Sequence, residues 1–355
     1  MSKENNIPEL TFRDKLYRYR QVVKNYCKNI FTALFQPALL EKLSPVEELN
    51  KCVVLLYHRV TDLTSDPQLL SVKPSNFSKH LEILSKKYNV LTIDEFSHYL
   101  KNRINFPKNS VLITFDDGYA DNFLEATPIL EHYKKQALFY IATGTLNTET
   151  EYWWDAIERI ILNSNNSPEV EYFEMNMKKY KIQNLSDSAR IELYETLLRD
   201  MKVMRSESRE MKIKELAELF NSTKGRNTHR GLTFDELKKM DQSESVVIGA
   251  HTHFHPCLAA QTFEDQFNEI STSKKILEEL LGKKIEHFSY PFGGAVHYNQ
   301  DTIAIVKELE FEFVAANIPT LMNAKSDRFQ FPRFLVRDWE KEEFEHNLNQ
   351  FFTNN

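Results

Sequence analysis

Short apolar runs alternate along the chain with longer segments in which apolar residues recur every three or four positions. The runs are typical of buried strands and the longer segments of amphipathic helices, so the alternation predicts βα units around a parallel sheet. The predicted strands are residues 52–57, 111–115, 137–143, 246–250, 287–290, 311–316 and 334–337. The predicted helices are residues 76–87, a segment ending at Tyr133, residues 263–281 and residues 299–309. This pattern predicts an α/β fold, a distorted and incomplete (β/α)7 barrel of about seven strands.

Local signals mark the ends of two predicted helices. Ser75 precedes residues 76–87 and Thr262 precedes residues 263–281, and both residue types are favoured helix N-caps. Gly282 follows the longer helix, where glycine readily adopts the left-handed conformation that ends a helix. We therefore expect these helices to begin at residues 76 and 263.

The regular alternation is interrupted by a long charged and largely helical segment. The chain divides into an N-terminal extension (1–48), a catalytic domain (49–340), an insertion within that domain (146–240) and a C-terminal tail (341–355). An insertion of this length is typical of a lid or a substrate-shaping subdomain. Its Trp153 and Trp154 have two interpretations of equal weight: the rings stack on a bound substrate, or they pin the insertion to the barrel.

Two adjacent carboxylates follow the predicted strand 111–115. Asp116 and Asp117 are followed by Gly118, and in α/β folds the chemistry lies just past the C-terminal ends of the strands. Neighbouring acids repel one another and resist desolvation, so a compensating cation is expected. A solvated Asp-Asp-Gly turn is the alternative interpretation.

Three histidines, His251, His253 and His255, follow the predicted strand 246–250. His251 and His255 are four residues apart and can converge on one ion if the backbone turns helically there, with Thr252 orienting the loop. A chain with 11 histidines produces such pairs by chance. Carboxylates and imidazoles at two strand ends are stronger evidence together. One Asp with two His leaves coordination positions open, which is typical of a catalytic metal.

These segments resemble the motifs of a known family. Thr114-Phe-Asp-Asp-Gly118 and His251-Thr-x-x-His255 are similar to the first two motifs of the polysaccharide deacetylases, carbohydrate esterase family 4 with the NodB-homology domain. Further matches are Tyr57-His-Arg-Val60, Pro128-Ile-Leu130, Phe288-Ser-Tyr-Pro-Phe-Gly293 and Phe331-Pro-Arg-Phe334. The resemblance extends over residues 50–145 and 245–340. It implies that Asp116 is the general base and that Asp117, His251 and His255 bind a divalent metal.

Two features depart from the family pattern. An Arg that orients the base often stands two residues before the proline of the third motif, where this chain has Ser289, so Arg333 in the last predicted strand is the candidate replacement. A late Leu-x-His motif that would supply the catalytic acid is also missing. The poly-N-acetylglucosamine deacetylase branch places this histidine in an early Tyr-His-Arg segment, which Leu55-Leu-Tyr-His-Arg-Val60 resembles. His58 is therefore the expected acid, with a structural strand-end histidine as the alternative.

These residue types suit hydrolysis of an amide. A divalent metal lowers the pKa of its bound water, and a carboxylate such as Asp116 can take the proton. A histidine that titrates near neutrality can protonate the departing amine. The backbone N–H of Tyr119 is a candidate second contact to the oxyanion. We expect further substrate contacts from Tyr290, Pro291 and Phe292.

Composition bounds the remaining possibilities. The net charge is −6 with acids and bases interspersed, so no basic face argues for nucleic acid. Cys27, Cys52 and Cys257 form no disulfide framework, which fits a reducing compartment, and Cys257 is expected to be a small buried residue rather than a metal ligand. No run approaches the roughly 20 apolar residues of a membrane span, and the first residues lack a signal-peptide pattern. We expect a cytoplasmic protein.

Residues 12–42 predict an amphipathic, mainly basic helix. The favoured interpretation is a helix packed on the domain. The alternative is a peripheral membrane-surface anchor that brings the protein to lipid-linked sugars.

The leading hypothesis is a metal-dependent hydrolase that removes N-acetyl groups from the amino sugars of a glycan or surface polysaccharide. Alternatives are a deformylase or other deacylase of amino sugars, and a catalytically weak glycan-binding relative. The missing motif Arg favours the weak relative, whereas the intact Asp-Asp-His-His set opposes it. A membrane-surface scaffold rests on the N-terminal helix alone. Zinc is the first expectation for the metal, with cobalt, nickel or iron(II) as alternatives, because geometry and availability decide metal identity.

Overall fold

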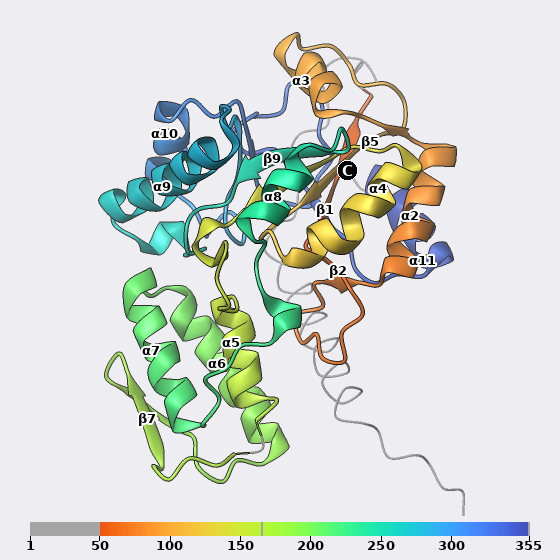
Figure 1. Ribbon diagram of the computed structural model, residues 1–355. Coiled ribbons are helices and arrows are strands. Elements are labelled where there is room, and N and C mark those ends of the chain that lie inside the picture. Colours follow the sequence, from red (N-terminus) through yellow and green to blue (C-terminus); the bar gives the residue numbers. More distant parts are fainter. Residues whose placement is uncertain (1–49, 165, 354–355) are drawn as a thin grey trace, which may run out of the picture.

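The computed structural model describes residues 50–164 and 166–353, and its centre is a parallel sheet (Figure 1). Seven strands follow one another in the order β11-β10-β9-β6-β5-β1-β12. Their bounds are β1 (Cys52–Tyr57), β5 (Ser110–Phe115), β6 (Ala137–Ile141), β9 (Val246–Ala250), β10 (His287–Ser289), β11 (Phe313–Ala315) and β12 (Phe334–Leu335). Each lies within or at a predicted strand, and the predicted α/β incomplete barrel is confirmed. The extension 1–48 and its predicted helix 12–42 lie outside the described residues.

The two edges of this sheet approach one another through a single short segment. β12 pairs in parallel with β1, with Phe334 opposite Leu55. Three residues earlier, Phe331 forms a parallel bridge with Ala315 of β11, the strand at the other edge. Residues 331–335 therefore contact both edge regions, and the sheet curls into a nearly closed barrel. A small strand, β4 (Asn89–Val90), also pairs with β5.

Strand β1 shows why the apolar runs are continuous rather than alternating. All six of its residues are buried, because both faces of the strand are covered. Val53, Leu55 and Tyr57 belong to one core cluster. Cys52 and Val54 belong to another, which also holds side chains from β5, β6 and β11. Since β11 lies at the far edge of the sheet, the second cluster fills the concave interior of the barrel.

Helices cover the outer side of the sheet (Figure 1). They are α2 (Pro74–Lys87), α4 (Thr127–Tyr133), α8 (Phe234–Asp241), α9 (Phe263–Leu281), α10 (Gln300–Glu308) and α11 (Lys341–Thr353). A further helix, α3 (Ile93–Lys101), packs Ile93, Phe96 and Leu100 against the interior cluster instead. A π-helical turn, η1 (Asn122–Ala126), leads into α4. Within the part of the chain that the structure describes, no helix has the length and apolar character to cross a bilayer.

Two of the three predicted helix-end signals are confirmed. The side chain of Thr262 accepts a hydrogen bond from the backbone N–H of Asp265, and Gly282 ends α9 with φ of 67°. The prediction for Ser75 was wrong, because α2 begins two residues earlier than predicted, at Pro74, with Lys73 as its N-cap. Pro74 explains the difference: proline suits the first helical position, where its missing N–H and fixed φ cost nothing.

The insertion forms a separate lobe with its own hydrophobic core (Figure 1). It contains α5 (Trp153–Ile161), the hairpin of β7 (Tyr172–Met175) and β8 (Lys178–Lys181), α6 (Asp187–Lys202) and α7 (Ser206–Leu219). Helix α8 fell within the predicted insertion range of 146–240, but its Leu237 and Met240 pack in the core of the barrel. The structural insertion therefore ends before α8.

The segment predicted as a C-terminal tail contains α11, which packs on α2. Phe344 and Leu348 are fully buried in the barrel core. The ring of Phe344 stacks on that of His80, with ring centroids 3.9 Å apart. α11 is thus an integral outer helix of the barrel.

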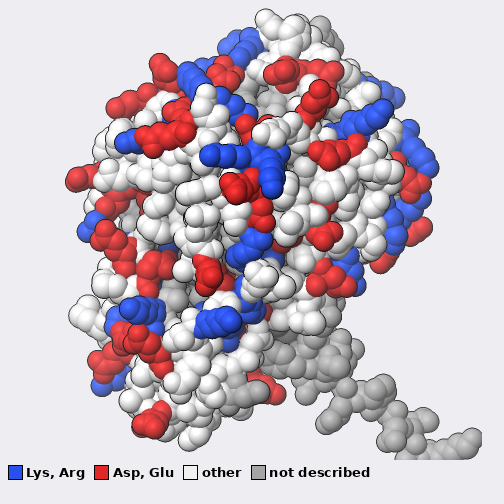
Figure 2. All heavy atoms as spheres, in the orientation of Figure 1, with Lys and Arg blue, Asp and Glu red and all other residues white. Residues whose placement is uncertain are grey.

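Positive and negative side chains are interspersed over the face shown in Figure 2. On this face neither sign forms a single continuous field. Surface pairs such as Lys79 with Glu340 and Lys101 with Glu312 contribute little stability individually, because they are exposed to solvent.

The packing of α11 predicts a large effect of Phe344→Ala on stability. Removing this fully buried ring should lower the free energy of unfolding by about 3–5 kcal/mol, because it leaves a cavity. Urea unfolding followed by circular dichroism measures the change. Phe263→Ala is the matched control, since Phe263 is 49% exposed, and it should change stability by less than about 0.5 kcal/mol. Equal effects of the two substitutions would contradict the assignment of α11 to the core.

Candidate metal and catalytic site

The C-terminal ends of β5 and β9 bring the predicted metal ligands together. Asp117, His251 and His255 each offer a ligand atom, and these atoms lie within 4.8 Å of one another. Asp117 Oδ1 is 3.6 Å from Nε2 of His251 and 3.6 Å from Nε2 of His255. All three side chains are buried. Ligands about 2.1 Å from a tetrahedral ion would be roughly 3.4 Å apart, so the spacing fits one metal ion.

The backbone turns sharply at each ligand segment. Asp117, Thr252 and His255 have φ of 78°, 64° and 53°, values that non-glycine residues adopt infrequently and that cluster at functional sites. The Asp117 carbonyl is held by the N–H of Ala142 at 3.0 Å and by the hydroxyl of Tyr152. Thr252 Oγ1 accepts the backbone N–H of His255 at 3.1 Å, which confirms that Thr252 orients the histidine loop.

Hydrogen bonding and burial prepare the histidines as neutral ligands. Nδ1 of His251 lies 2.7 Å from the carbonyl oxygen of Ser289. A carbonyl only accepts, so Nδ1 carries the hydrogen and Nε2 is left with its lone pair toward Asp117. Burial lowers the pKa of His251 and lowers that of His255 further, where the charge of His251 adds to the effect. Neutral imidazole is the form that binds a metal.

The protein itself does not supply the positive charge that would keep Asp117 ionised. Burial, followed by the neighbouring Asp116 and Asp155, raises the pKa of Asp117 well above its usual range. A divalent cation would reverse this effect, because it favours the ionised carboxylate. One carboxylate and two neutral imidazoles with suitable spacing therefore fit a divalent metal, and this donor set suits several first-row ions.

Asp116 is compensated in a different way, by Arg333. The guanidinium reaches both carboxylate oxygens, with Nη1 to Oδ1 and Nη2 to Oδ2 each 2.7 Å. Burial alone would raise the pKa of Asp116, but the charge and hydrogen bonds of Arg333, together with His251 and His58, outweigh it and hold the pKa below the usual value. Asp116 is therefore anionic. The structure places Arg333 where the sequence analysis expected an orienting Arg.

Ser289, which occupies the position of the family's motif Arg, belongs to the same network. Its hydroxyl accepts a hydrogen bond from Arg333 Nη2 at 2.7 Å and donates to Asp116 Oδ2 at 3.2 Å. From the sequence, Ser289 was recognisable only as the position of a missing Arg. Its place at the end of β10, two residues before Pro291, was the signal that it faces the site.

His58 follows β1 and also reaches this site. Its pKa is lowered to about 3, chiefly by burial, with Asp116 opposing the shift and Arg333 adding to it. Its Nδ1 is buried and has no hydrogen-bond partner among the described residues. The ring is therefore neutral in the free protein. Its assignment as the catalytic acid remains a prediction.

Comparison with known proteins agrees with this geometry. The profile of the polysaccharide deacetylase family matches residues 103–194 and 213–314, more than half of the chain. YxkH of Bacillus subtilis, assigned to the polysaccharide deacetylases, is 34% identical over 274 residues, 77% of this chain and 67% of its own length. The chain belongs to the polysaccharide deacetylase family. The resemblance seen in the motifs is thus confirmed.

Further relatives of this deacetylase agree in sequence or in fold. The poly-beta-1,6-N-acetyl-D-glucosamine N-deacetylase of Staphylococcus aureus is 23% identical over 315 residues, 85% of this chain and 83% of its own. The structure of the Streptococcus pyogenes deacetylase PplD in complex with acetate has a TM-score of 0.55 at 19% identity, covering 84% of this chain and 99% of that one. IcaB from Ammonifex degensii has a TM-score of 0.53 at 18% identity, covering 85% and 97%.

The predicted substrate contacts of the deacetylase occupy different environments. Phe292 is partly buried, and its ring meets that of His255 edge-on at 4.6 Å. Pro291 is buried beside it. Tyr290 is fully buried, its hydroxyl donates to the carbonyl of Phe329, and its ring stacks on that of Tyr298. A sugar contact by the ring of Tyr290 is therefore corrected to a role in the barrel core.

The side chains of Tyr119, Trp153 and Trp154 lie in the junction between the barrel and the insertion. Trp154 Nε1 donates to the hydroxyl of Tyr119 at 2.8 Å, and the Trp154 ring meets His255 at 4.7 Å. The guanidinium of Arg209 lies 4.7 Å from the Trp153 ring. Both indoles are buried, so this arrangement matches the interpretation that they pin the insertion. Of Tyr119, only the backbone N–H remains a candidate for contact with substrate.

Glu269 of α9 holds the histidine loop, and the sequence analysis missed it. Its Oε2 accepts the backbone N–H groups of His253 at 3.0 Å and Phe254 at 2.8 Å. Its Oε1 accepts the hydroxyl of Ser206, the first residue of α7, at 2.7 Å. Glu269 therefore connects the loop between the two metal-ligating histidines with the insertion. A glutamate in a long amphipathic helix gives no sequence signal for such a role.

The bidentate contact predicts that Arg333→Lys impairs catalysis more than binding. A lysine cannot reproduce two parallel hydrogen bonds, so Asp116 loses its orientation. We expect kcat for de-N-acetylation to fall by about 100-fold or more, with KM and bound metal nearly unchanged. Ser289→Ala removes one longer contact to Asp116 and should cost less. Activity of Arg333→Lys within about threefold of native would contradict this role.

The position of Glu269 predicts that Glu269→Ala weakens metal binding. Loss of the carboxylate releases two loop N–H groups, and the dissociation constant for Zn²⁺ should rise about 10- to 100-fold. Competition with a chelating dye measures it without any activity assay. Glu269→Gln keeps an acceptor oxygen and should recover part of the affinity. Glu264→Ala on the exposed face of α9 is the control, and equal constants for the two alanine variants would refute the assignment.

Proposed function

We propose that this protein removes N-acetyl groups from a β-1,6-linked polymer of N-acetylglucosamine. The observation that carries the proposal is the anionic Asp116, clamped by Arg333 directly beside the Asp117, His251 and His255 set. The linkage is supported by the Staphylococcus aureus relative, which spans 85% of this chain. The early position of His58 supports the same branch of the family.

We infer that the resident metal is zinc, held by Asp117, His251 and His255. Two imidazoles and a carboxylate form a donor set common at catalytic zinc, with coordination positions left open. When bound, a divalent ion supplies a Lewis acid and lowers the pKa of a coordinated water. Burial of the three ligands keeps bulk water from weakening these charges.

Asp116 acts as the general base in this proposal. Because Arg333 keeps its pKa low, the carboxylate is ionised and ready to accept a proton from the attacking water. The same guanidinium bonds both oxygens and so fixes the plane of the carboxylate, with Oδ2 3.8 Å from Nε2 of the ligand His251. The backbone N–H of Tyr119, which directly follows the turn at Gly118, is the candidate donor to the developing oxyanion.

His58 acts as the acid that protonates the departing amine. Burial keeps the ring neutral in the free protein, so its proton arrives during the reaction. The proton that His58 receives is the one that Asp116 takes from the attacking water. Asp116 and His58 therefore act one after the other. The sugar leaves as a free amine and the acyl group leaves as acetate.

A cytoplasmic location and a peripheral contact with the membrane through residues 12–42 are further proposals that rest on the sequence alone. The supporting observation is the pattern of apolar residues among Lys and Arg in this segment. The segment lies outside the described residues.

Acetate release from a β-1,6-linked N-acetylglucosamine pentamer tests the function. The zinc-loaded native protein should release acetate, and Asp116→Asn should reduce the rate by about 10³-fold because the base is lost. A β-1,4-linked pentamer and an N-formyl analogue should react more slowly. Faster reaction of the β-1,4 pentamer would refute the linkage, and faster reaction of the formyl analogue would refute the acyl group. If native and Asp116→Asn proteins released acetate equally, the proposed mechanism would be wrong.

A further inference from the structure

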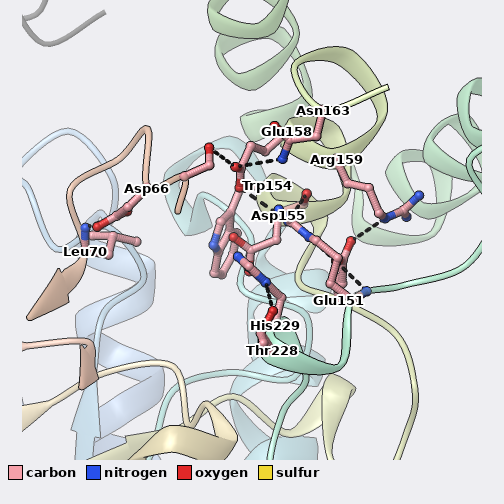
Figure 3. Close-up of polar contacts among 12 residues, drawn as sticks. Asp66, Leu70, Glu151, Trp154, Asp155, Glu158, Arg159, Asn163, Thr228 and His229 are labelled. Atoms are coloured by element: carbon pink, nitrogen blue, oxygen red, sulfur yellow. Dashed lines mark hydrogen bonds and ion pairs between the residues drawn. The ribbon is translucent and has the colours of Figure 1, made fainter. Parts of the chain in front are cut away.

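A second group of metal-binding residue types lies where the insertion meets the barrel (Figure 3). Asp155 and Glu158 come from α5, where a spacing of three places them on one face. His229 comes from the short helix η3 (Asn227–His229), in the segment that leads back to the barrel. One ligand atom from each lies within 4.8 Å of the others. The three residues are 7%, 2% and 4% exposed.

Two of these side chains have polar atoms without a hydrogen-bond partner among the described residues. Nδ1 of His229 contacts the hydroxyl of Thr228 at 2.9 Å, which leaves Nε2 unpaired. Oδ2 of Asp155 accepts the hydroxyl of Tyr119 at 2.7 Å, which leaves Oδ1 unpaired. Both side chains are more than 90% buried, yet neither of these atoms is completely sealed from solvent, so each is available to a ligand that enters the adjoining cavity.

A small cavity separates the barrel loop after β2 (Arg59–Val60) from this cluster. Asp155, Glu158 and His229 line it, together with residues of the loop such as Asp66. It has room for about one water-sized particle, which is also the size of a single metal ion. An organic ligand would not fit.

The acidic residues that line the cavity outnumber the guanidinium groups that line it. Asp66, Asp155 and Glu158 line it, together with the guanidinium of Arg59. Arg226 contacts Glu158 at 3.3 Å, and the charge of Arg337 acts on Asp66. The carboxylate of Asp155 has no direct contact with a cation among the described residues, so a cation in the cavity would compensate it.

Asp155 is the carboxylate least compensated in this group. Arg59 is committed to Asp121, at 2.9 Å, and to the carbonyl of Thr228. Arg226 pairs with Glu151 and Glu158. Burial raises the pKa of Asp155 to about 7, although Arg59 acts against the shift. The carboxyl therefore sits in a site that penalises its charge in the absence of a further cation.

We propose that Asp155, Glu158 and His229 bind a second divalent metal ion. Two carboxylates and an imidazole favour a first-row ion that accepts oxygen and nitrogen ligands, such as Zn²⁺ or Mn²⁺. The ion would join α5 of the insertion to the returning segment at η3. It would also brace the catalytic site from outside, because Asp155 holds Tyr119 and the Thr228 carbonyl holds Arg59, the neighbour of His58. This second ion is a structural one, independent of the deacetylation chemistry.

Metal stoichiometry tests the proposal. Full-length protein is equilibrated with Zn²⁺, dialysed and measured by elemental analysis. We expect about two ions per chain for the native protein, about one each for His229→Gln and His255→Gln, and about none when both are replaced. About one ion in the native protein, or an unchanged value for His229→Gln, would overturn the proposal.

The ion at the catalytic site serves as a folding control. A His229→Gln chain that still binds this ion is folded, so loss of the other ion cannot be attributed to misfolding. Thermal unfolding gives a second measurement: Zn²⁺ should raise the Tm of His255→Gln, and adding Asp155→Asn should abolish that rise. No rise in His255→Gln would refute the site. His287→Gln is the matched control, since His287 is buried with an unpaired Nδ1 but has no such carboxylate pair. If it also lost one ion, the assignment to His229 would fail.

Discussion

The two adjacent carboxylates at the end of β5 impose the constraint on which the site depends. Both are buried, and neither can remain ionised without a positive partner close by. The protein meets this requirement in two ways: Arg333 pairs with Asp116, while two neutral histidines leave Asp117 to a metal. The C-terminal ends of β9 and β10 must therefore meet the end of β5, and the residue that precedes β12 must reach the same place. The parallel curled sheet satisfies the first condition because the C-terminal ends of its strands lie at one rim, and the long side chain of Arg333 satisfies the second from the start of β12.

The parts of the molecule that were predictable are those whose residue types serve few structural or chemical roles. Buried strands read as apolar runs, and Asp117, His251 and His255 were predictable because carboxylates and imidazoles at strand ends rarely serve packing. Arg333 was predictable because the family that the chain resembles uses an Arg to orient the base, and the usual position of that Arg holds Ser289. Side-chain direction was not: Tyr290 lies in a motif beside the site, yet its ring points into the core. The start of α2 was misplaced for a local reason, the first-turn preference of Pro74.

The sequence did not reveal the polar side chains whose role depends on what they contact in the folded protein. Glu269 and Asp155 read as ordinary charged positions on amphipathic helices, and only the fold reveals that each faces a loop from another part of the chain. Glu269 connects the insertion with the histidine loop through Ser206 and His253. Asp155 connects the insertion with Tyr119, which follows β5. The insertion is therefore fixed to the catalytic strands by buried polar contacts as well as by the packing of Trp153 and Trp154.

The segment 331–335 bridges the two edge regions of the sheet and contains Arg333. The activity of the catalytic base therefore depends on when this segment folds into place. The contact between Arg333 and Asp116 spans 217 positions of sequence, so it forms only when one of the longest loops in the chain has closed. Before that step Asp116 lacks the cation that orients it, even if the metal ligands on β5 and β9 are already in place. Barrel closure and activation of the base are thus one event. A partly folded chain that has captured its metal is still unable to hydrolyse its substrate.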